Sequence, residues 1–276
     1  MKKILFMFII LTFLIGYYAI IFEPNNIKIE KYNLIIENLP SSFNNLKIAH
    51  LSDLHSLRFG PREKKVLEML EELKPDLVFI TGDFVDPIGK IITDRKLISI
   101  KNFWQKLGEK YKDKIFVVLG NHDTKIIKNY LEESGIVVLN NENKKLFLDK
   151  LDKNEEFIYL IGVADPVFKK ANLVKAMEDI EEKTPKILLA HGPEIMAQVN
   201  NKKIDLILVG HTHGGQVNIP ILGELLQPLS QYGRQYTKGL FKIDSTYLYV
   251  NRGIGTSLFP IRFACSPEIT LIVLNF

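Results

Sequence analysis

The sequence has few of the features that mark secreted or nucleic-acid-binding proteins. It contains a single cysteine, Cys265, so no disulfide can form within the chain and no oxidising compartment is required. A strong charge of one sign is also lacking. The formal net charge is +4, of which Lys2 and Lys3 supply two. The charge that remains is too small and too scattered for a nucleic-acid-binding surface, so we expect no nucleic-acid partner.

One segment departs from an otherwise ordinary globular composition of 46% hydrophobic and 25% charged residues. Ile4 to Phe22 holds 19 residues without a charge. At about 1.5 Å of rise per residue, a helix of this length spans roughly the ~30 Å hydrocarbon core of a bilayer. Tyr17 and Tyr18 lie near its far end, where amphipathic aromatic side chains tend to settle. A cleaved signal is disfavoured, because the run exceeds the usual ~7–15 residues and no small-x-small site follows.

The chain is therefore expected to divide into a transmembrane anchor at residues 1–25 and one domain at residues 26–276. Lys2 and Lys3 precede the apolar run, which places them in the cytoplasm and the domain outside under the positive-inside rule. This predicts a single-pass protein of the cell membrane, with the bilayer as a partner. No linker or repeat divides the remaining sequence.

A repeated pattern beyond residue 45 predicts an α/β domain. Five short apolar runs each end in polar, metal-capable side chains close to glycine: 46–51, 77–81, 115–119, 187–190 and 206–209. Helical periodicity fits the intervening stretches 61–73, 97–107, 126–133 and 173–180. Strands that alternate with helices favour a buried, largely parallel sheet. The alternating segment 27–37 resembles an outer strand.

The C-terminal third has a different pattern. Residues 239–244, 246–251 and 268–275 read as strands without helices between them. We therefore expect a second, more antiparallel sheet packed on the first.

Five of the six histidines lie at the ends of the predicted strands, which scattered core or surface histidines would not do. Ligands of open α/β sheets bind beyond the carboxyl ends of the strands, so these side chains should converge. Asp53 and His55 are two residues apart, as are His211 and His213. In an extended segment such pairs point to the same side and can face one metal cluster.

The number and type of ligands predict two divalent metal ions. Carboxylate, amide and imidazole groups without sulfur suit Mn, Fe or Zn, and Mn is the foremost candidate. The seven potential ligands are too many for one tetrahedral zinc ion: Asp53, His55, Asp83, Asn121, His191, His211 and His213. Two ions about 3.5–4 Å apart, joined by a bridging carboxylate, would use all of them.

The motif order resembles that of the calcineurin-like metallophosphoesterases. It reads Asp53-Leu-His55, Gly82-Asp83-x-x-Asp86, Gly120-Asn121-His122-Asp123, His191-Gly192 and Gly210-His211-Thr-His213. The continuation Gly214-Gly215-Gln216, with the segment 253–267, is similar to a bacterial membrane-associated branch that includes phosphodiesterases and hydrolases of UDP-2,3-diacylglucosamine. The resemblance implies a four-layer αββα sandwich, with two mixed sheets flanked by helices, after the transmembrane helix.

The resemblance also implies a role for each motif residue. One metal ion is expected on Asp53, His55 and His213, a second on Asn121, His191 and His211, with Asp83 as the bridge. His122 is expected to be the general acid that protonates the leaving oxygen, with Asp123 orienting it. Attack by a metal-bound hydroxide, without a covalent intermediate, would complete the reaction.

Several other residues have weaker assignments. Arg58 is the candidate contact for a substrate phosphate, and Arg252 and Arg262 are lesser ones. Structural roles are expected for His50 inside an apolar run, Asp86 bracing the loop after Asp83, Cys265 as an inert thiol and Trp104 in the core.

The sequence thus predicts a membrane-tethered phosphodiesterase or pyrophosphatase that acts on a lipid-linked or cell-envelope phosphoester. A nuclease or a cyclic-nucleotide phosphodiesterase is an alternative within the same chemistry. A non-catalytic metal-binding scaffold is an alternative of another class, disfavoured because every catalytic position is filled. The sequence does not indicate the oligomeric state.

Overall fold

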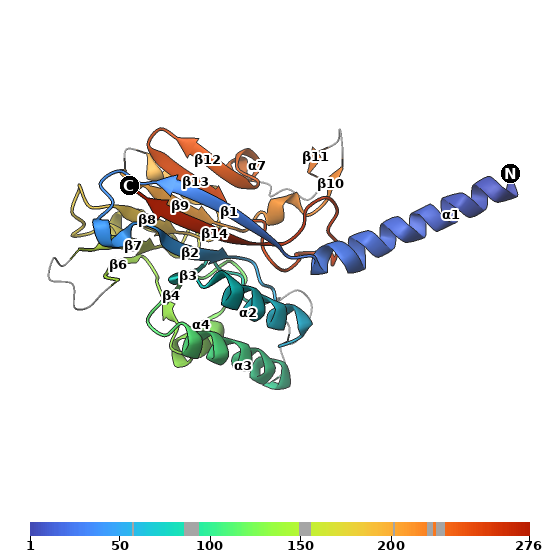
Figure 1. The fold of residues 1–276 in the computed structure, drawn as a ribbon, viewed down its shortest axis with the longest axis horizontal. Coiled ribbons are helices and arrows are strands. Elements are labelled where there is room, and N and C mark those ends of the chain that lie inside the picture. Colours follow the sequence, from blue (N-terminus) through green and yellow to red (C-terminus); the bar gives the residue numbers. More distant parts are fainter. Residues whose placement is uncertain (57, 86–93, 149–155, 201, 220–222, 225–229) are drawn as a thin grey trace.

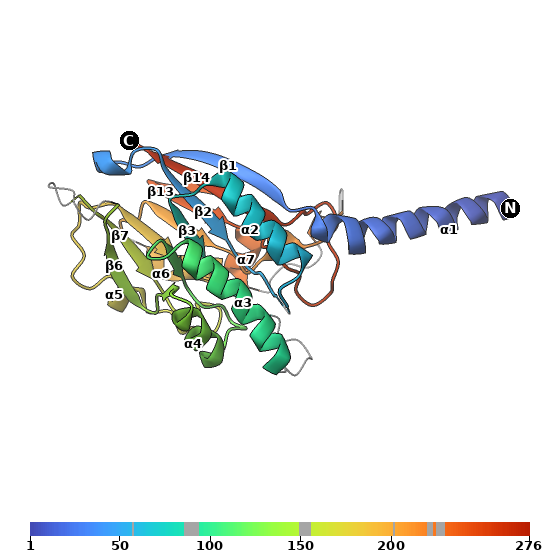
Figure 2. The same ribbon diagram turned by 60° about the horizontal axis from the view of Figure 1, so that its bottom comes forward.

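The computed structural model describes the chain apart from residues 57, 86–93, 149–155, 201, 220–222 and 225–229. Two six-stranded sheets lie face to face, with helices on their outer sides (Figures 1 and 2). The helices are α1 (Lys2–Tyr17), α2 (Pro61–Leu73), α3 (Asp94–Lys110), α4 (Lys125–Glu133), α5 (Leu173–Ala176), α6 (Met196–Val199) and α7 (Gln231–Gln235).

The first sheet has the order β1-β14-β2-β3-β4-β5. Strands β2 to β5 run parallel to one another, whereas β14 is antiparallel to β2 and parallel to β1. Their bounds are β1 (Lys28–Ile35), β2 (Leu46–Leu51), β3 (Leu77–Ile80), β4 (Ile115–Val117), β5 (Val137–Val138) and β14 (Glu268–Asn275).

The second sheet has the order β12-β13-β9-β8-β7-β6. Its four central strands are parallel, and an antiparallel strand closes each edge. Their bounds are β6 (Glu142–Leu146), β7 (Ile158–Gly162), β8 (Lys186–Leu189), β9 (Leu206–Val209), β12 (Gly239–Ile243) and β13 (Thr246–Val250). A separate small hairpin joins β10 (Asn218–Ile219) to β11 (Gly223–Glu224).

Because side chains alternate along each strand, each sheet packs on the other sheet with one face and on a layer of helices with the opposite face. In β3, Leu77 and Phe79 face the other sheet, whereas Val78 and Ile80 face helices α2, α3 and α4. The outer face of the second sheet packs in the same way on α5 and α6. Strands buried on both faces are nearly continuous hydrophobic runs, which is the pattern the sequence shows. The four-layer sandwich of two mixed sheets is therefore confirmed.

The expected second sheet packed on the first is present, but it is not formed by the C-terminal strands alone and is mostly parallel. β12 and β13 extend the sheet that already contains β8 and β9, and β14 crosses to the first sheet, where it pairs with β2. The strands themselves were correctly anticipated, because their local pattern is clear. Their partners were not, because pairing depends on contacts distant in sequence. Strands β5, β6 and β7 were not anticipated, and the helix expected at 173–180 ends at Ala176.

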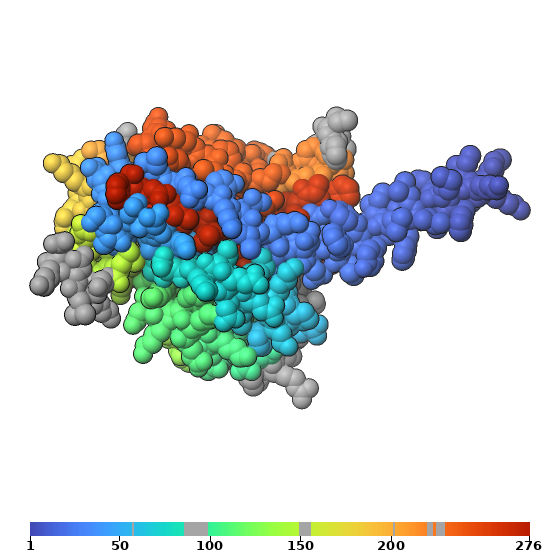
Figure 3. Space-filling view, in the orientation of Figure 1, coloured from blue at the N-terminus to red at the C-terminus, as the bar shows by residue number. Residues whose placement is uncertain are grey.

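The helix α1 projects from one end of the sandwich (Figures 1 and 3). β1 runs antiparallel to β2 through their shared partner β14, so β1 begins where β2 ends. The helix leads directly into β1 through the π-helical turn Tyr18–Phe22 and the 3₁₀ turn Glu23–Asn25. It is long and apolar enough to cross a membrane, and none of its most apolar window is buried in the protein.

Phe79→Ala tests the inter-sheet core. Phe79 is fully buried between the sheets. Its truncation should lower the free energy of unfolding by about 3–5 kcal/mol through lost transfer energy and an unfilled cavity. Urea unfolding of the detergent-solubilised chain, followed by Trp104 fluorescence, measures the change. Ile35→Ala, on the exposed face of the edge strand β1, is the control and should cost less than about 1 kcal/mol. Equal losses in both variants would contradict this assignment of the core.

Candidate active site

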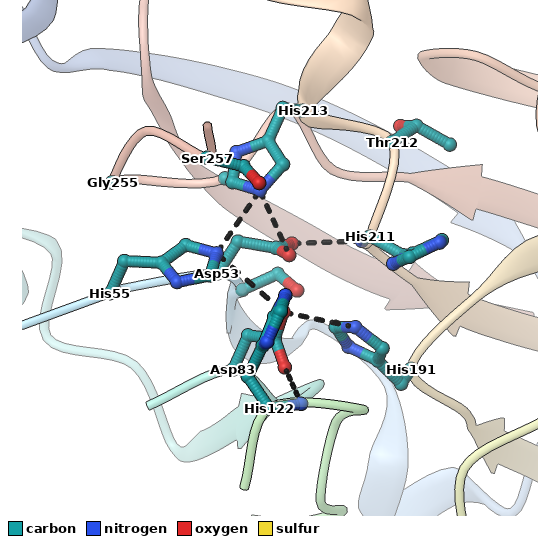
Figure 4. A network of polar contacts seen from close by, with 12 residues as sticks. Asp53, His55, Asp83, His122, His191, His211, Thr212, His213, Gly255 and Ser257 are labelled. Carbon is teal, nitrogen blue, oxygen red and sulfur yellow. Dashed lines mark hydrogen bonds and ion pairs between the residues drawn. The ribbon is translucent and has the colours of Figure 1, made fainter. Parts of the chain in front are cut away.

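The polar ends of five parallel strands meet at one edge of the sandwich (Figure 4). Asp53 and His55 follow β2, and Asp83 follows β3. The remaining side chains follow strands β4, β8 and β9: Asn121, His122, His191, His211 and His213. The sequence-based prediction that these residues converge is thus met, with contributions from both sheets.

Six of the side chains form two groups, each with its donor atoms within 4.8 Å of one another. The first group holds Asp53, His55 and His213, and the second holds Asp83, His191 and His211. Asn121 joins the second group, because its Oδ1 lies 2.9 Å from Nε2 of His191. In the first group, Nε2 of His213 lies 3.2 Å from Nε2 of His55 and 3.5 Å from Oδ1 of Asp53.

The carboxylate of Asp83 lies between the two groups. Its Oδ2 is 3.5 Å from Nε2 of His55 in the first group and 3.4 Å from Nε2 of His191 in the second. Its Oδ1 accepts a hydrogen bond of 3.0 Å from the backbone N–H of His122, which fixes the carboxylate in this orientation. One oxygen of Asp83 therefore faces both groups.

The backbone brings these side chains together by turning sharply. Five of the residues have positive φ angles: Asp53 (49°), His55 (42°), Asp83 (54°), His211 (70°) and His213 (50°). Non-glycine residues adopt this left-handed conformation rarely, and it concentrates at functional sites where surrounding contacts hold it. The residues of each pair converge on the site as expected, but they do so from left-handed turns and not from extended backbone. His211 and His213 lie in different groups.

Close packing of the backbone leaves no room for side chains behind the ligands. A Cβ at Gly120 would lie 2.6 Å from the backbone nitrogen of Asp83 and 2.8 Å from Cε1 of His191. At Gly253, with φ of 71°, a Cβ would lie 2.7 Å from Cβ of Asp53. Glycine at these positions permits the approach of the loops to the ligands.

The donor atoms fit divalent cations. Oδ1 of Asp53 is buried and has no hydrogen-bond donor among the described residues. Nδ1 of His191 donates to the carbonyl oxygen of Thr81 at 2.7 Å, which directs Nε2 toward the site. Carboxylate oxygen and imidazole nitrogen atoms that converge in a buried site are suited to coordinate divalent metal ions.

The buried ionisable groups of the site shift one another's pKa values. Burial raises the pKa of Asp53 to about 6. Burial acts on Asp83 in the same direction, but the nearby charge of His191 outweighs it and lowers the pKa of Asp83 below its usual range. Burial, together with the charge of His191, lowers the pKa of His211 to about 3, so this imidazole is neutral and carries a lone pair. Burial lowers the pKa of His191, but the charges of Asp83 and Asp53 outweigh it and raise that pKa well above its usual value, so His191 balances the charge of Asp83 within the protein.

His122 lies at the rim of the site. Its side chain is 27% exposed, whereas that of Asp83 is 2% exposed, and the Nε2 atom of His122 is 3.9 Å from Oδ2 of Asp83. The expected contact with Asp123 is absent from the described structure. The carboxylate of Asp123 instead accepts hydrogen bonds from the backbone N–H groups of Asp83, Phe84 and Gly120, at 2.8 to 2.9 Å. Asp123 therefore braces the two loops and does not orient the imidazole of His122.

The three arginines considered for phosphate binding have different environments. Arg58 is exposed near this edge and makes no hydrogen bond or ion pair with the described residues. Arg252 and Arg262 are unsuited to the role, contrary to the weaker expectation. Arg252 is paired with Glu30 and Glu268.

Arg262 is a structural residue. It is fully buried, and its guanidinium donates to the carbonyl oxygens of Arg252, Gly253, Gly255 and Cys265. These hydrogen bonds direct the N–H groups of the guanidinium to carbonyl oxygens of one loop, and not to a substrate.

The residues expected to be structural behave as such where they are described. His50 is fully buried, with Nε2 2.9 Å from Oγ1 of Thr81, and burial lowers its pKa to about 3. Trp104 packs in the core between α3 and the first sheet, and Cys265 is a buried free thiol. Asp86 lies outside the described residues.

Sequence reasoning overlooked the loop that supports Asp53 from behind. The backbone N–H of Ile254 donates to Ser52, and that of Gly255 donates to Asp53, at 3.0 and 2.7 Å. Gly253 and Gly255 entered the sequence-based prediction only as part of the segment 253–267 that carries the family resemblance. Two nearby glycines after a predicted strand were the available signal that another backbone approaches closely.

Buried aspartate, asparagine and histidine side chains at the strand ends of a four-layer α/β fold define a metallohydrolase type of site. A family model described as calcineurin-like phosphoesterase matches residues 46–215. The chain is 30% identical over 268 residues to the metallophosphoesterase YkuE of Bacillus subtilis (strain 168), covering 94% of this chain and 90% of YkuE. It is 31% identical over 239 residues to the phosphodiesterase YaeI of Escherichia coli (strain K12), covering 83% and 82% of the two chains.

A third relative is the UDP-2,3-diacylglucosamine pyrophosphatase LpxG of Chlamydia trachomatis serovar D. It is 27% identical over 305 residues, covering 91% of this chain and 90% of LpxG. The protein therefore belongs to the calcineurin-like phosphoesterase family. It is a metallophosphoesterase, a hydrolase of a family that uses divalent metals.

Gly120→Ala tests the packing behind the ligands. The added methyl group must displace either the Asp83 backbone or the His191 ring, so turnover should fall about a hundredfold, the effect of a shift of about 1 Å in a catalytic site. Bound metal, measured by mass spectrometry, should fall with it. Gly16→Ala in α1, where a Cβ meets nothing within 4 Å, is the control and should behave like the wild type. Unchanged activity in Gly120→Ala would contradict the close approach.

Proposed function

We propose that the protein is a two-metal phosphodiesterase or pyrophosphatase that acts on a membrane-embedded phosphoester. The position of Asp83 between two sets of donor atoms carries this proposal, because a bridging carboxylate is what places two cations next to each other. Asp53, His55 and His213 would hold one ion, and Asn121, His191 and His211 the other, with Asp83 shared.

Two divalent ions in these positions would lower the pKa of a water molecule and neutralise charge on the phosphoryl group. Mn is the proposed metal, since the ligands combine oxygen and imidazole nitrogen without sulfur. The chain's own part is to hold the ligands rigidly. Asp123 supports this by binding the backbone on both sides of Asp83, so its proposed role is positioning.

His122 is the proposed general acid. Its backbone N–H is tied to Oδ1 of Asp83, while its partly exposed imidazole remains at the rim, where a leaving group can reach it. A proton donated from this imidazole to the leaving oxygen avoids expulsion of an alkoxide. Arg58, exposed near the same edge, is the proposed contact for a second phosphate or a charged headgroup.

The substrate proposal rests on α1. Its apolar surface is suited to crossing a bilayer once, with Lys2 and Lys3 on the cytoplasmic side and residues 26–276 outside. A site tied to a membrane in this way meets lipid-linked phosphoesters at high local concentration. The substrate named for the chlamydial relative, a nucleotide-sugar lipid, is of this chemical type.

The full chain in detergent should hydrolyse bis-p-nitrophenyl phosphate when Mn²⁺ is added, and a chelator should abolish the activity. His122→Ala should keep its bound metal but lose turnover about 10²–10⁴-fold, the usual contribution of a general acid. His50→Gln is the control for the loss of a histidine that lies outside the metal groups and should retain activity. Inactivity of the wild type with Mn²⁺, Fe²⁺, Zn²⁺ and Co²⁺ would refute the enzymatic proposal. Loss of metal in His122→Ala would make that residue a ligand.

A substrate panel tests the finer proposal. Nucleotide-sugar lipids and phospholipids in mixed micelles should be cleaved with higher kcat/KM than single-stranded DNA or cyclic nucleotides. A preference for DNA or for a cyclic nucleotide would favour a nuclease or a cyclic-nucleotide phosphodiesterase instead.

A further inference from the structure

The edge of the domain that holds the site is also the edge from which α1 projects. Strand β2 ends at Leu51 on this edge, two residues before Asp53, and β1 and β14, which run antiparallel to β2, begin there. A bilayer crossed by α1 would therefore lie on the side of the site, opposite the edge where β14 ends (Figures 1 and 2).

The end of the helix is fixed to a loop of this edge, residues 252–267. The backbone N–H of Arg262 donates to the carbonyl oxygen of Ala19 at 2.9 Å. The buried Glu23 accepts hydrogen bonds from the backbone N–H of Cys265 at 3.1 Å and from Oγ of Ser266 at 2.8 Å. The ring of Tyr18 packs edge-to-face on Phe263, with centroids 5.7 Å apart. The helix and the loop therefore form one unit.

The same loop exposes two large apolar side chains. Leu258 is 68% exposed and Phe259 is 58% exposed, a few residues from the amide that bonds Ala19. Leu258 has a φ of 53°, a backbone conformation that leucine rarely adopts. The conformation is held from inside the domain, because Gln216 accepts from the N–H of Ser257 and donates to the carbonyl oxygens of Phe259 and Ile261. Two apolar side chains are thus held outward by a loop whose backbone is in an unfavourable conformation at Leu258.

We infer that Leu258 and Phe259 form a second contact with the bilayer, next to the anchor, which turns the mouth of the site toward the lipid surface. The partner is the lipid bilayer itself, because the two exposed apolar side chains belong to the loop that is bonded to the base of the apolar helix α1. Amphipathic or apolar side chains beside a transmembrane segment gain free energy by entering the interfacial region. This inference rests on the membrane anchoring proposed above.

The loop also contacts the metal-binding residues. Gly255 donates to the backbone of Asp53, and Sγ of Cys265 lies 3.4 Å from the carbonyl oxygen of His213. The guanidinium of Arg262 binds four carbonyl groups and holds the loop as one body. A lipid-embedded substrate could reach the site without leaving the membrane, since the lipid contact and the Asp53 group belong to the same rigid loop.

A fluorescence experiment on the full chain tests the contact. The chain has one tryptophan, Trp104, which is buried in the core and serves as the reference. Phe259→Trp is reconstituted into phosphatidylglycerol and phosphatidylethanolamine vesicles whose acyl chains are brominated near the headgroups. Its additional emission should be shifted to the blue and quenched by the bromolipid. Phe276→Trp, 69% exposed at the opposite edge, is the matched control and should be neither shifted nor quenched.

Each outcome decides the inference. Quenching of Phe259→Trp alone supports it. Absence of quenching in Phe259→Trp, with the protein still floating with the vesicles, overturns the lipid contact but leaves the anchor and the enzymatic proposal intact. Equal quenching in both variants overturns the orientation of the site toward the bilayer. Failure of the wild type to float with the vesicles overturns the anchor, and the inference with it. None of these readouts depends on catalytic activity.

Discussion

The carboxylate of Asp83 is the group on which the two halves of the site depend. One of its oxygens faces His55 and His191, which belong to different groups of donor atoms and come from different sheets. The other oxygen is fixed by the backbone of His122. Asp123 then secures the arrangement, because its carboxylate binds the backbone N–H groups of both Asp83 and Gly120. The loops after β3 and β4 are joined through these carboxylates, and the strand order of the first sheet puts the two loops next to each other.

The fold makes this junction possible by sending parallel strands from both sheets to the same edge. These strands are buried on both faces over most of their length, so the side chains that form the site lie beyond their ends. The left-handed backbone of five residues beyond the ends of β2, β3 and β9 turns the side chains inward at a local conformational cost. Tight packing against glycine holds the turns in place, and the large inter-sheet core supplies the rigidity that keeps the donor atoms in register.

Much of this could be predicted from the sequence, because the strand ends carry their ligands in the local pattern. Strand β2 followed by Asp53 and His55 is visible from a handful of neighbouring residues, and so is β9 followed by His211 and His213. The pairing of strands could not be predicted in the same way, because it depends on contacts between residues distant in sequence. The crossing of β14 to the first sheet and the pairing of β13 with β9 join segments far apart in the chain.

Contacts between residues distant in sequence also explain why the roles of two side chains were predicted wrongly. The sequence does not reveal that the carboxylate of Asp123 is occupied by backbone amides, nor that Arg262 is enclosed by carbonyl groups. Both residues have the charge expected of a functional group, and both use it to hold loops. Whether such a charged residue acts on a substrate or supports a loop depends on its neighbours in space, which the sequence does not show. The metal ligands were easier to identify because several motifs occur together in a fixed order.

The count of metal ions per chain tests the central claim most directly. Mass spectrometry of the chain loaded with Mn²⁺ and freed of excess metal should find two ions in the wild type and one in His213→Ala. Asp83→Ala should retain fewer ions than His213→Ala, because the carboxylate is shared by both groups. A single ion in the wild type, or equal retention in the two variants, would contradict the account of Asp83 as the bridge.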